Sequence, residues 1–265
     1  SDLPAVLAKT KRVLYLEDGE VVELGASSAR ITTLEGSPVR RGASTIGWSL
    51  EAARKTGFPH FMLKEIHEQP AAIEQTLYNR LDARRGEIAF DRRTRAFLDA
   101  FKPDEQLVII ACGTAYHAGL VGEYMLEEFA HLPVDVDLAS EFRYRELEFD
   151  RPTTVLAITQ SGETADTLAG LQRAQAKGAR TMAICNVMGS TISREAEAVL
   201  YTHAGPEIAV ASTKAYTSQL TALALLTLYL AKRRNKTLQV ARRRQLIRGL
   251  AGLPALIERA LAGEA

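Results

Sequence analysis

The chain has little excess charge, little cysteine and no long hydrophobic run. Of its 265 residues, 33 are lysine or arginine and 32 are aspartate or glutamate, so the formal net charge is +1. This balance gives no general electrostatic reason to expect a nucleic acid or a membrane as partner, and small-molecule chemistry remains. The longest apolar run, Leu220–Ala231, is too short to cross a bilayer, and the N-terminus lacks the layout of a signal peptide. We therefore expect a soluble, cytoplasmic protein.

Cysteine and histidine usage narrows the chemistry further. The two cysteines, Cys112 and Cys185, each follow a predicted strand, and free thiols are expected rather than a disulfide in a chain of this composition. The histidines are scattered without the spacing that metal ligands show. We expect neither a metal site nor a cofactor.

Residues 11–36 have the pattern of β-strands. Val13–Leu16 and Val21–Leu24 flank an Asp18-Gly19 pair, which predicts a hairpin, and Ala29–Leu34 predicts a further strand. So few strands cannot bury enough apolar surface to fold alone. They must either pack on the rest of the chain or form the tail of a larger domain, and we favour the tail.

The next part of the chain reads as a linker followed by helices. Residues 40–60 have no sustained period and contain several glycines, which is typical of a linker. From Pro70 onward, Ile73 and Leu77 recur on one face, which predicts a helix. A second short helix is predicted over Arg92–Phe101.

The remaining sequence alternates apolar strands with helical patterns. The predicted strands are 107–111, 134–136, 154–158, 181–184 and 199–201, and the predicted helices are 115–130, 164–177, 191–197 and 213–231. This alternation is typical of parallel strands joined by right-handed crossovers, with helices on both faces. We expect an α/β fold, a doubly wound five-stranded parallel sheet of the flavodoxin-like order 2-1-3-4-5.

The turn Thr159–Thr167 carries the strongest chemical signal. Hydroxyl and amide side chains surround Gly162 between a predicted strand and a predicted helix, where free backbone N–H groups and the positive end of the helix dipole meet. Such a turn suits an anion, above all a phosphate. The alternative is an ordinary capped turn with Ser161 as the N-cap residue.

The expected strand order places this turn beside another. In a 2-1-3-4-5 sheet, the turns after the first and third strands line the crevice at the switch point. These turns are Cys112–Tyr116 and Thr159–Thr167, while Cys185–Ser190 and Glu207–Lys214 could border the same cleft. No lysine or arginine lies in the main turn, so modest, exchangeable binding of a phosphate is expected.

Several motifs together resemble the first sugar-isomerase (SIS) domain of the isomerising glutamine:fructose-6-phosphate aminotransferases, or glucosamine-6-phosphate synthases. The motifs are Ser161–Thr167, Cys112-Gly113-Thr114, Ala139–Arg145, Val210–Lys214 and, upstream, Lys64–Pro70. The resemblance implies closing strands of a glutaminase domain over residues 1–37, a linker over 38–69, a first SIS domain over 70–250 and, over 251–265, the start of a connection to a second SIS domain.

The resemblance also implies a function and a set of binding residues. The family converts fructose 6-phosphate and glutamine to glucosamine 6-phosphate for UDP-N-acetylglucosamine synthesis, and it works as a dimer. The positions that match the family's phosphate site are Thr159, Gln160, Ser161 and Thr164, and those near the sugar are Thr114, Val210 and Ser212. Ala115 stands where the family usually has serine, which removes one hydroxyl contact.

The family's catalytic groups have no match in this sequence. Its glutaminase nucleophile is an N-terminal cysteine, and its isomerase base, ring-opening histidine and imine-forming lysine belong to the second SIS domain and the C-terminal tail. The resemblance therefore implies a hexose 6-phosphate half-site without catalytic residues, inactive on its own. A stand-alone SIS-domain sensor or regulator is the alternative, although no basic face or DNA-reading unit is visible.

Overall fold

The first part of the chain forms only short strands. The computed structural model describes residues 9–17, 19–26, 28–45 and 55–263, and the chain divides into two units, Ser1–Thr56 and Gly57–Ala265. The strands of the first unit are β1 (Arg12–Val13), β2 (Glu20–Leu24), β3 (Ala29–Thr33), β4 (Pro38–Val39) and β5 (Ser44–Thr45). Residues 46–54 of the expected linker, and residues 1–8, lie outside the described part.

The hairpin predicted around Asp18-Gly19 is wrong. β2 pairs with β3 in the antiparallel sense, and β1 pairs instead with β5. Val22 faces Ile31, which is buried in this unit, and the Arg41 guanidinium binds the Glu20 carboxylate at 2.8 Å. The turn predicted after β3 is present, with β4 pairing back onto β3.

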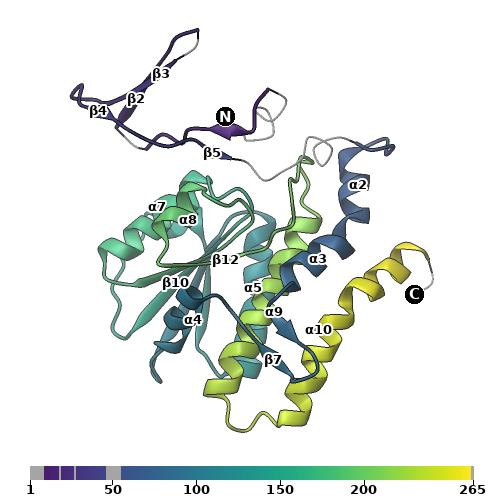
Figure 1. The fold of residues 1–265 in the computed structure, drawn as a ribbon. Coiled ribbons are helices and arrows are strands. Elements are labelled where there is room, and N and C mark those ends of the chain that lie inside the picture. Colours follow the sequence, from purple (N-terminus) through teal and green to yellow (C-terminus); the bar gives the residue numbers. More distant parts are fainter. Residues whose placement is uncertain (1–8, 18, 27, 46–54, 264–265) are drawn as a thin grey trace. The chain divides into compact units, whose positions relative to one another are not determined.

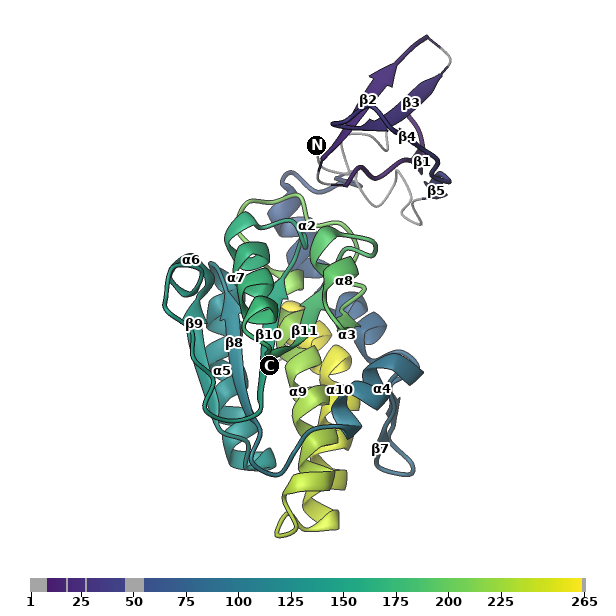
Figure 2. The same cartoon turned by 90° about the vertical axis from the view of Figure 1, so that its left-hand side faces the viewer.

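The second unit contains the predicted parallel sheet. Its strands are β8 (Gln106–Ala111), β9 (Val134–Leu138), β10 (Thr153–Thr159), β11 (Arg180–Cys185) and β12 (Ala198–Tyr201). All neighbours are parallel and the spatial order is β12-β11-β10-β8-β9, which in chain order is 2-1-3-4-5 (Figure 2). The prediction of a doubly wound, flavodoxin-like sheet is confirmed.

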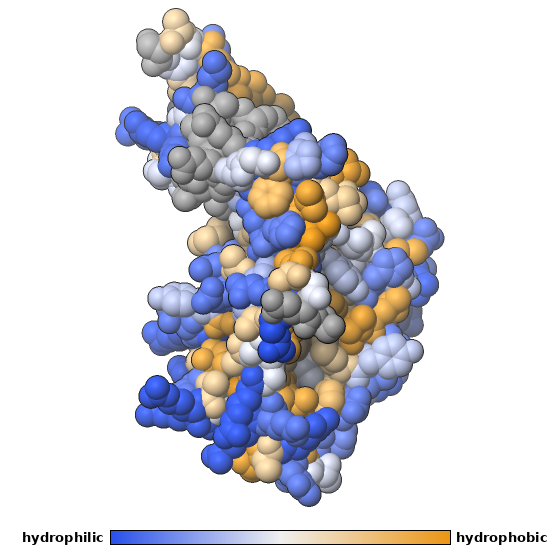
Figure 3. Space-filling view, turned by 90° about the vertical axis from the view of Figure 1, so that its right-hand side faces the viewer, coloured by the Kyte–Doolittle hydropathy of each residue, from blue (hydrophilic) through white to orange (hydrophobic). Residues whose placement is uncertain are grey.

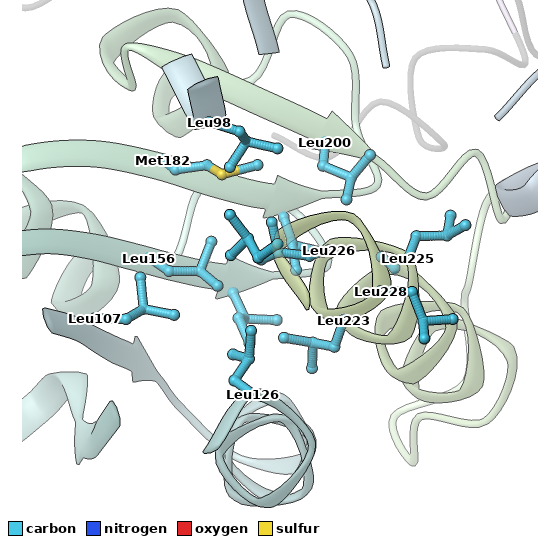
Figure 4. Close-up of a cluster of buried hydrophobic side chains, with 14 of the residues drawn as sticks. Leu98, Leu107, Leu126, Leu156, Met182, Leu200, Leu223, Leu225, Leu226 and Leu228 are labelled. Atoms are coloured by element: carbon cyan, nitrogen blue, oxygen red, sulfur yellow. The ribbon is translucent and has the colours of Figure 1, made fainter. Parts of the chain in front are cut away.

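The central strands are apolar because both of their faces are covered. Successive strand residues point to opposite faces. Ile109 and Leu156 belong to one buried cluster, and Val108 and Val155 belong to the other. Figure 4 shows the first cluster, in which leucines of β8 and β10 meet leucines of the long helix α9 (Lys214–Arg234).

The helices form a layer on each side of the sheet (Figure 1). One face carries α5 and α9, with α3 and α4 beside them, and the other carries α6, α7 and α8. The bounds are α2 (Phe61–His67), α3 (Gln69–Leu77), α4 (Arg92–Asp99), α5 (Thr114–Ala130), α6 (Ala139–Phe142), α7 (Ala165–Ala176) and α8 (Thr191–Glu195). A small ribbon, β6 (Leu81–Asp82) with β7 (Glu87–Ile88), lies between α3 and α4 in the chain.

Close packing of α5 on α9 depends on a glycine. A Cβ on Gly122 would lie 2.9 Å from a methyl carbon of Leu223, so any larger residue there would force this leucine to move. The contact places the start of α5, which carries Thr114, beside the start of α9. Both helix starts face the C-terminal edge of the sheet.

The last helix, α10 (Val240–Leu261), continues through Pro254 and packs on α3 and α9. Figure 3 looks onto this helix and shows hydrophilic side chains gathered on the lower part of the face. The expected end of the first SIS domain, between residues 250 and 251, falls within α10. The division of the chain into domains stays a prediction, with limits at 1–37, 38–69, 70–250 and 251–265. Within the described residues, no helix has both the length and the apolar character needed to span a membrane.

Candidate functional site

A cavity of about 210 Å³ lies at the C-terminal edge of the sheet, between the turns that follow β8 and β10. It contains all the residues that the sequence singled out for binding: Thr114, Thr159, Gln160, Ser161, Thr164, Val210 and Ser212. Its other lining residues are Cys112, Ala115, Ile158, Thr167, Glu207, Ala209 and Gln219. The switch-point argument therefore located the cavity correctly, although it says nothing about what the cavity binds.

The turn after β10 is held by its own hydroxyl groups. The Thr159 Oγ1 accepts a hydrogen bond from the Gly162 amide at 3.1 Å, and the Ser161 Oγ accepts one from the Glu163 amide at 3.1 Å. Helix α7 begins at Ala165, and its N-cap residue, Thr164, makes no side-chain cap bond. Ser161 is therefore not the N-cap residue of α7, although its hydroxyl and that of Thr159 accept backbone hydrogen bonds that stabilise the turn.

Gly162 fits this turn for two physical reasons. Its φ is +70°, a conformation in which a Cβ atom is strained. A Cβ there would also lie 2.5 Å from the Ser190 Cβ and 2.9 Å from the Cys185 Sγ. The turn after β11 thus packs beneath the Thr159–Thr164 turn, and its residues are not among those lining the cavity.

The carboxylates near the start of α7 are already engaged. The Arg143 guanidinium donates to the Asp166 carboxylate at 2.7 Å, a bond that raises the pKa of Arg143. Glu163 accepts hydrogen bonds from the amide and the hydroxyl of Thr191, at 2.8 and 2.7 Å. The Arg143 ion pair offsets the charge of Asp166 at this end of α7, and the bonds from Thr191 hold Glu163 against the start of α8. The helix start thus keeps its partial positive charge for an anion in the cavity.

Of the described residues that line the cavity, Glu207 is the one carboxylate, and none is lysine or arginine. Its Oε1 accepts hydrogen bonds from the amides of Thr213 and Ala215, at 2.9 and 3.1 Å, and its Oε2 accepts one from the Ser212 hydroxyl at 2.9 Å. These bonds fix the segment that leads into α9. They also hold the carboxylate in one orientation.

The same wall is supported from behind by α2. The Glu65 carboxylate, only 2% exposed, accepts hydrogen bonds from the amides of Ile208 and Ala209, at 2.6 and 3.2 Å. One turn away, Glu68 pairs with the buried Lys214 ammonium at 2.7 Å. Helix α2 lies in the stretch predicted as a linker, so part of that stretch shapes the cavity wall.

Sequence reasoning placed most of the lining residues at the cleft but missed Gln219. The sequence places Glu207 near the cleft without a role. In the structure it lies in the segment that joins β12 to α9. Gln219 is a polar residue of α9 that is only 3% exposed, and its Oε1 has no hydrogen-bond partner within the described part of the chain. Cys112 and Ala115 belong to the turn after β8 that the switch-point rule placed at the crevice, and both line the cavity. Among the described residues, no cluster of three or more histidine, cysteine, aspartate or glutamate side chains could hold a metal ion.

Comparison with known proteins identifies the domain. Residues 101–229, which run from just before β8 into α9, match the family described as the SIS domain. The chain carries a SIS domain. The match includes the turns after β8 and β10 and all the residues that line the cavity.

The SIS domain and its flanks are similar to glutamine–fructose-6-phosphate aminotransferases (isomerising). The enzyme of Thermus thermophilus is 51% identical over 261 residues, which cover 98% of this chain and 42% of the relative. The enzyme of Symbiobacterium thermophilum is 47% identical over 254 residues, 96% of this chain and 41% of the relative. The chain thus spans less than half the length of these relatives.

A solved structure supports the same relationship. The C-terminal domain of glucosamine-fructose-6-phosphate aminotransferase from Francisella tularensis superposes with a TM-score of 0.73 at 40% sequence identity, covering 79% of this chain and 57% of that one. The resemblance drawn from the sequence motifs is confirmed.

Proposed function

We propose that the cavity binds a hexose 6-phosphate, fructose 6-phosphate or glucosamine 6-phosphate, with the phosphate at the start of α7. The observation that carries this proposal is the convergence of Gln160, Ser161 and Thr164 on one small cavity at a helix N-terminus. Hydroxyl and amide groups, together with unpaired helix N–H groups, are the donors that a phosphate needs. The names of the similar enzymes support a phosphorylated hexose as the ligand.

The cavity suits a ligand that must exchange. Its described lining residues include no lysine or arginine, so dipoles and neutral hydroxyls replace a full counter-charge. Each neutral hydrogen bond contributes about 0.5–1.5 kcal/mol net, which allows binding without trapping the product. Ala115 presents a methyl group where the family usually has a hydroxyl. We expect this departure to weaken binding by about one such bond, without abolishing it.

We further propose that the chain is the sugar-phosphate-binding part of an isomerising aminotransferase. The whole enzyme would make glucosamine 6-phosphate and glutamate from fructose 6-phosphate and glutamine, for UDP-N-acetylglucosamine synthesis. The ionisable side chains that line the cavity are Cys112 and Glu207, and Glu207 already accepts bonds at both oxygens. We therefore propose that these 265 residues bind the sugar phosphate but do not turn it over, and release no glutamate from glutamine. A homodimer and a cytoplasmic location are part of the same proposal.

Replacement of Ser161 by alanine tests the phosphate site. Binding of fructose 6-phosphate, measured by titration calorimetry, should weaken roughly 2- to 12-fold, which corresponds to one hydrogen bond, while binding of unphosphorylated fructose should not change. Ser140→Ala, in α6 and outside the cavity lining, is the control and should bind like the unaltered chain. Equal losses for the two sugars would overturn the phosphate assignment.

A further inference from the structure

Two serines of the cavity are held in opposite ways. Ser161, after β10, accepts a hydrogen bond at its Oγ from the Glu163 amide. Ser212, before α9, donates its hydroxyl hydrogen to the Glu207 carboxylate. Since a hydroxyl has one hydrogen and two lone pairs, the two serines offer different groups to a ligand.

Ser161 offers a donor. Its amide contact uses a lone pair, and the hydroxyl hydrogen has no acceptor within the described residues, so it can point at an anionic oxygen. Ser212 offers an acceptor. An ionised carboxylate cannot donate a hydrogen bond. The Ser212 hydroxyl hydrogen therefore stays directed at the Glu207 carboxylate, and only the lone pairs of the Ser212 oxygen face the cavity.

Glu207 cannot easily turn away from this arrangement. The amides of Thr213 and Ala215 both donate to its other oxygen, at 2.9 and 3.1 Å. These bonds tie the carboxylate to the first turn of α9. The part of the cavity formed by Glu207 and Ser212 therefore combines a negative charge with hydroxyl lone pairs. Both disfavour a phosphate and favour a hydroxyl or amino group that donates a hydrogen bond.

We propose that Glu207 is a specificity-determining residue that sets the orientation of the ligand, by holding Ser212 as a hydrogen-bond acceptor and repelling phosphate from that wall. This inference rests on the proposed binding of a hexose 6-phosphate and deepens it. The phosphate lies at Ser161 and Thr164, and a hydroxyl group of the sugar, or an amino group of the product, donates to Ser212. Glu207 itself positions Ser212.

Glu207→Gln tests this assignment because it changes the charge but keeps the shape. The glutamine oxygen can still accept from Thr213 and Ala215, so its NH₂ group faces Ser212. Ser212 then accepts from that NH₂ group and turns its hydrogen toward the cavity. Inorganic phosphate should bind more tightly to this variant than to the unaltered chain. The ratio of affinities for fructose 6-phosphate over inorganic phosphate should fall by roughly 2- to 12-fold, one hydrogen bond.

Ser212→Ala provides an independent arm because it leaves the two amide bonds of Glu207 intact. It should weaken fructose 6-phosphate by a similar factor and leave inorganic phosphate unchanged. Affinities are measured by titration calorimetry, with thermal unfolding to confirm the fold. Should Glu207→Gln unfold, Ser212→Ala decides alone. An unchanged affinity ratio in folded variants, or parallel losses for both ligands, would overturn the inference.

The Ser161→Ala variant separates this inference from the proposed function. If Ser161→Ala weakens both ligands while the Glu207 and Ser212 variants leave their affinity ratio unchanged, the orientation is wrong and the sugar-phosphate site stands. If the unaltered chain binds neither ligand, or Ser161→Ala affects neither, the proposed function and this inference fall together.

Discussion

Gly162 lies so close to Ser190 that a Cβ atom on the glycine would be 2.0 Å from the serine Oγ. The turn that carries Ser161 and Thr164 therefore rests directly on the turn after β11. Because interiors resist added volume, the position of the hydroxyl groups in the cavity depends on this contact.

Gly162→Ala should lower the free energy of unfolding by about 2–5 kcal/mol, since about 1–2 kcal/mol of strain at positive φ adds to about 1–3 kcal/mol of overpacking. Gly178→Ala is the matched control, because Gly178 has a φ of +85° but a Cβ there would meet nothing within 4 Å. Urea unfolding of both variants separates strain from packing. Equal losses in the two variants would show that the Ser190 contact contributes nothing.

Glu65→Ala should damage the cavity wall from a distance. The Ile208 and Ala209 amides would lose their acceptor, at a cost of about 1–3 kcal/mol in stability, and fructose 6-phosphate should bind more weakly because Val210 and Ser212 are no longer held. Glu65→Gln keeps an acceptor oxygen and should restore most of the affinity. Glu74→Ala, on an exposed position of α3, serves as control. Unchanged affinity in a folded Glu65→Ala variant would contradict the support of the wall by α2.

The two thiols should react differently with iodoacetamide. Cys112 is half-buried and lines the cavity, so it should be alkylated, and fructose 6-phosphate should slow this reaction. Cys185 is buried, and burial raises the pKa of its thiol, so little of the reactive thiolate forms. Mass spectrometry of digested samples, with Cys112→Ala as control, gives both rates. Alkylation of Cys112 at the same rate with saturating sugar phosphate would place the ligand elsewhere.

The fold was predictable where its signals are local. The apolar run before Thr159 and the helical spacing after Thr164 predict a strand, a turn and a helix without reference to the rest of the chain. The alternation of such units predicts a parallel sheet, and the switch-point rule then places two turns together. The gathering of Thr114 and Ser161 in one cavity followed from these rules.

The remaining features depend on contacts between distant residues. The N-terminal pairing was missed because Asp18-Gly19 is a strong local turn signal, whereas β1 pairs with β5, a strand far along the chain that no local signal links to it. Glu65 and Ile208 are 143 positions apart in the sequence, and neither predicts the other. The sequence likewise does not show that Ser212 offers an acceptor to the cavity, because this depends on its hydrogen bond to Glu207.

The most direct test of the account is a crystal of the chain soaked with fructose 6-phosphate. We predict that the phosphate oxygens lie within hydrogen-bond distance, about 2.5–3.0 Å, of the Ser161 and Thr164 hydroxyls at the start of α7. A phosphate bound elsewhere, with these hydroxyls free of ligand, would contradict the account.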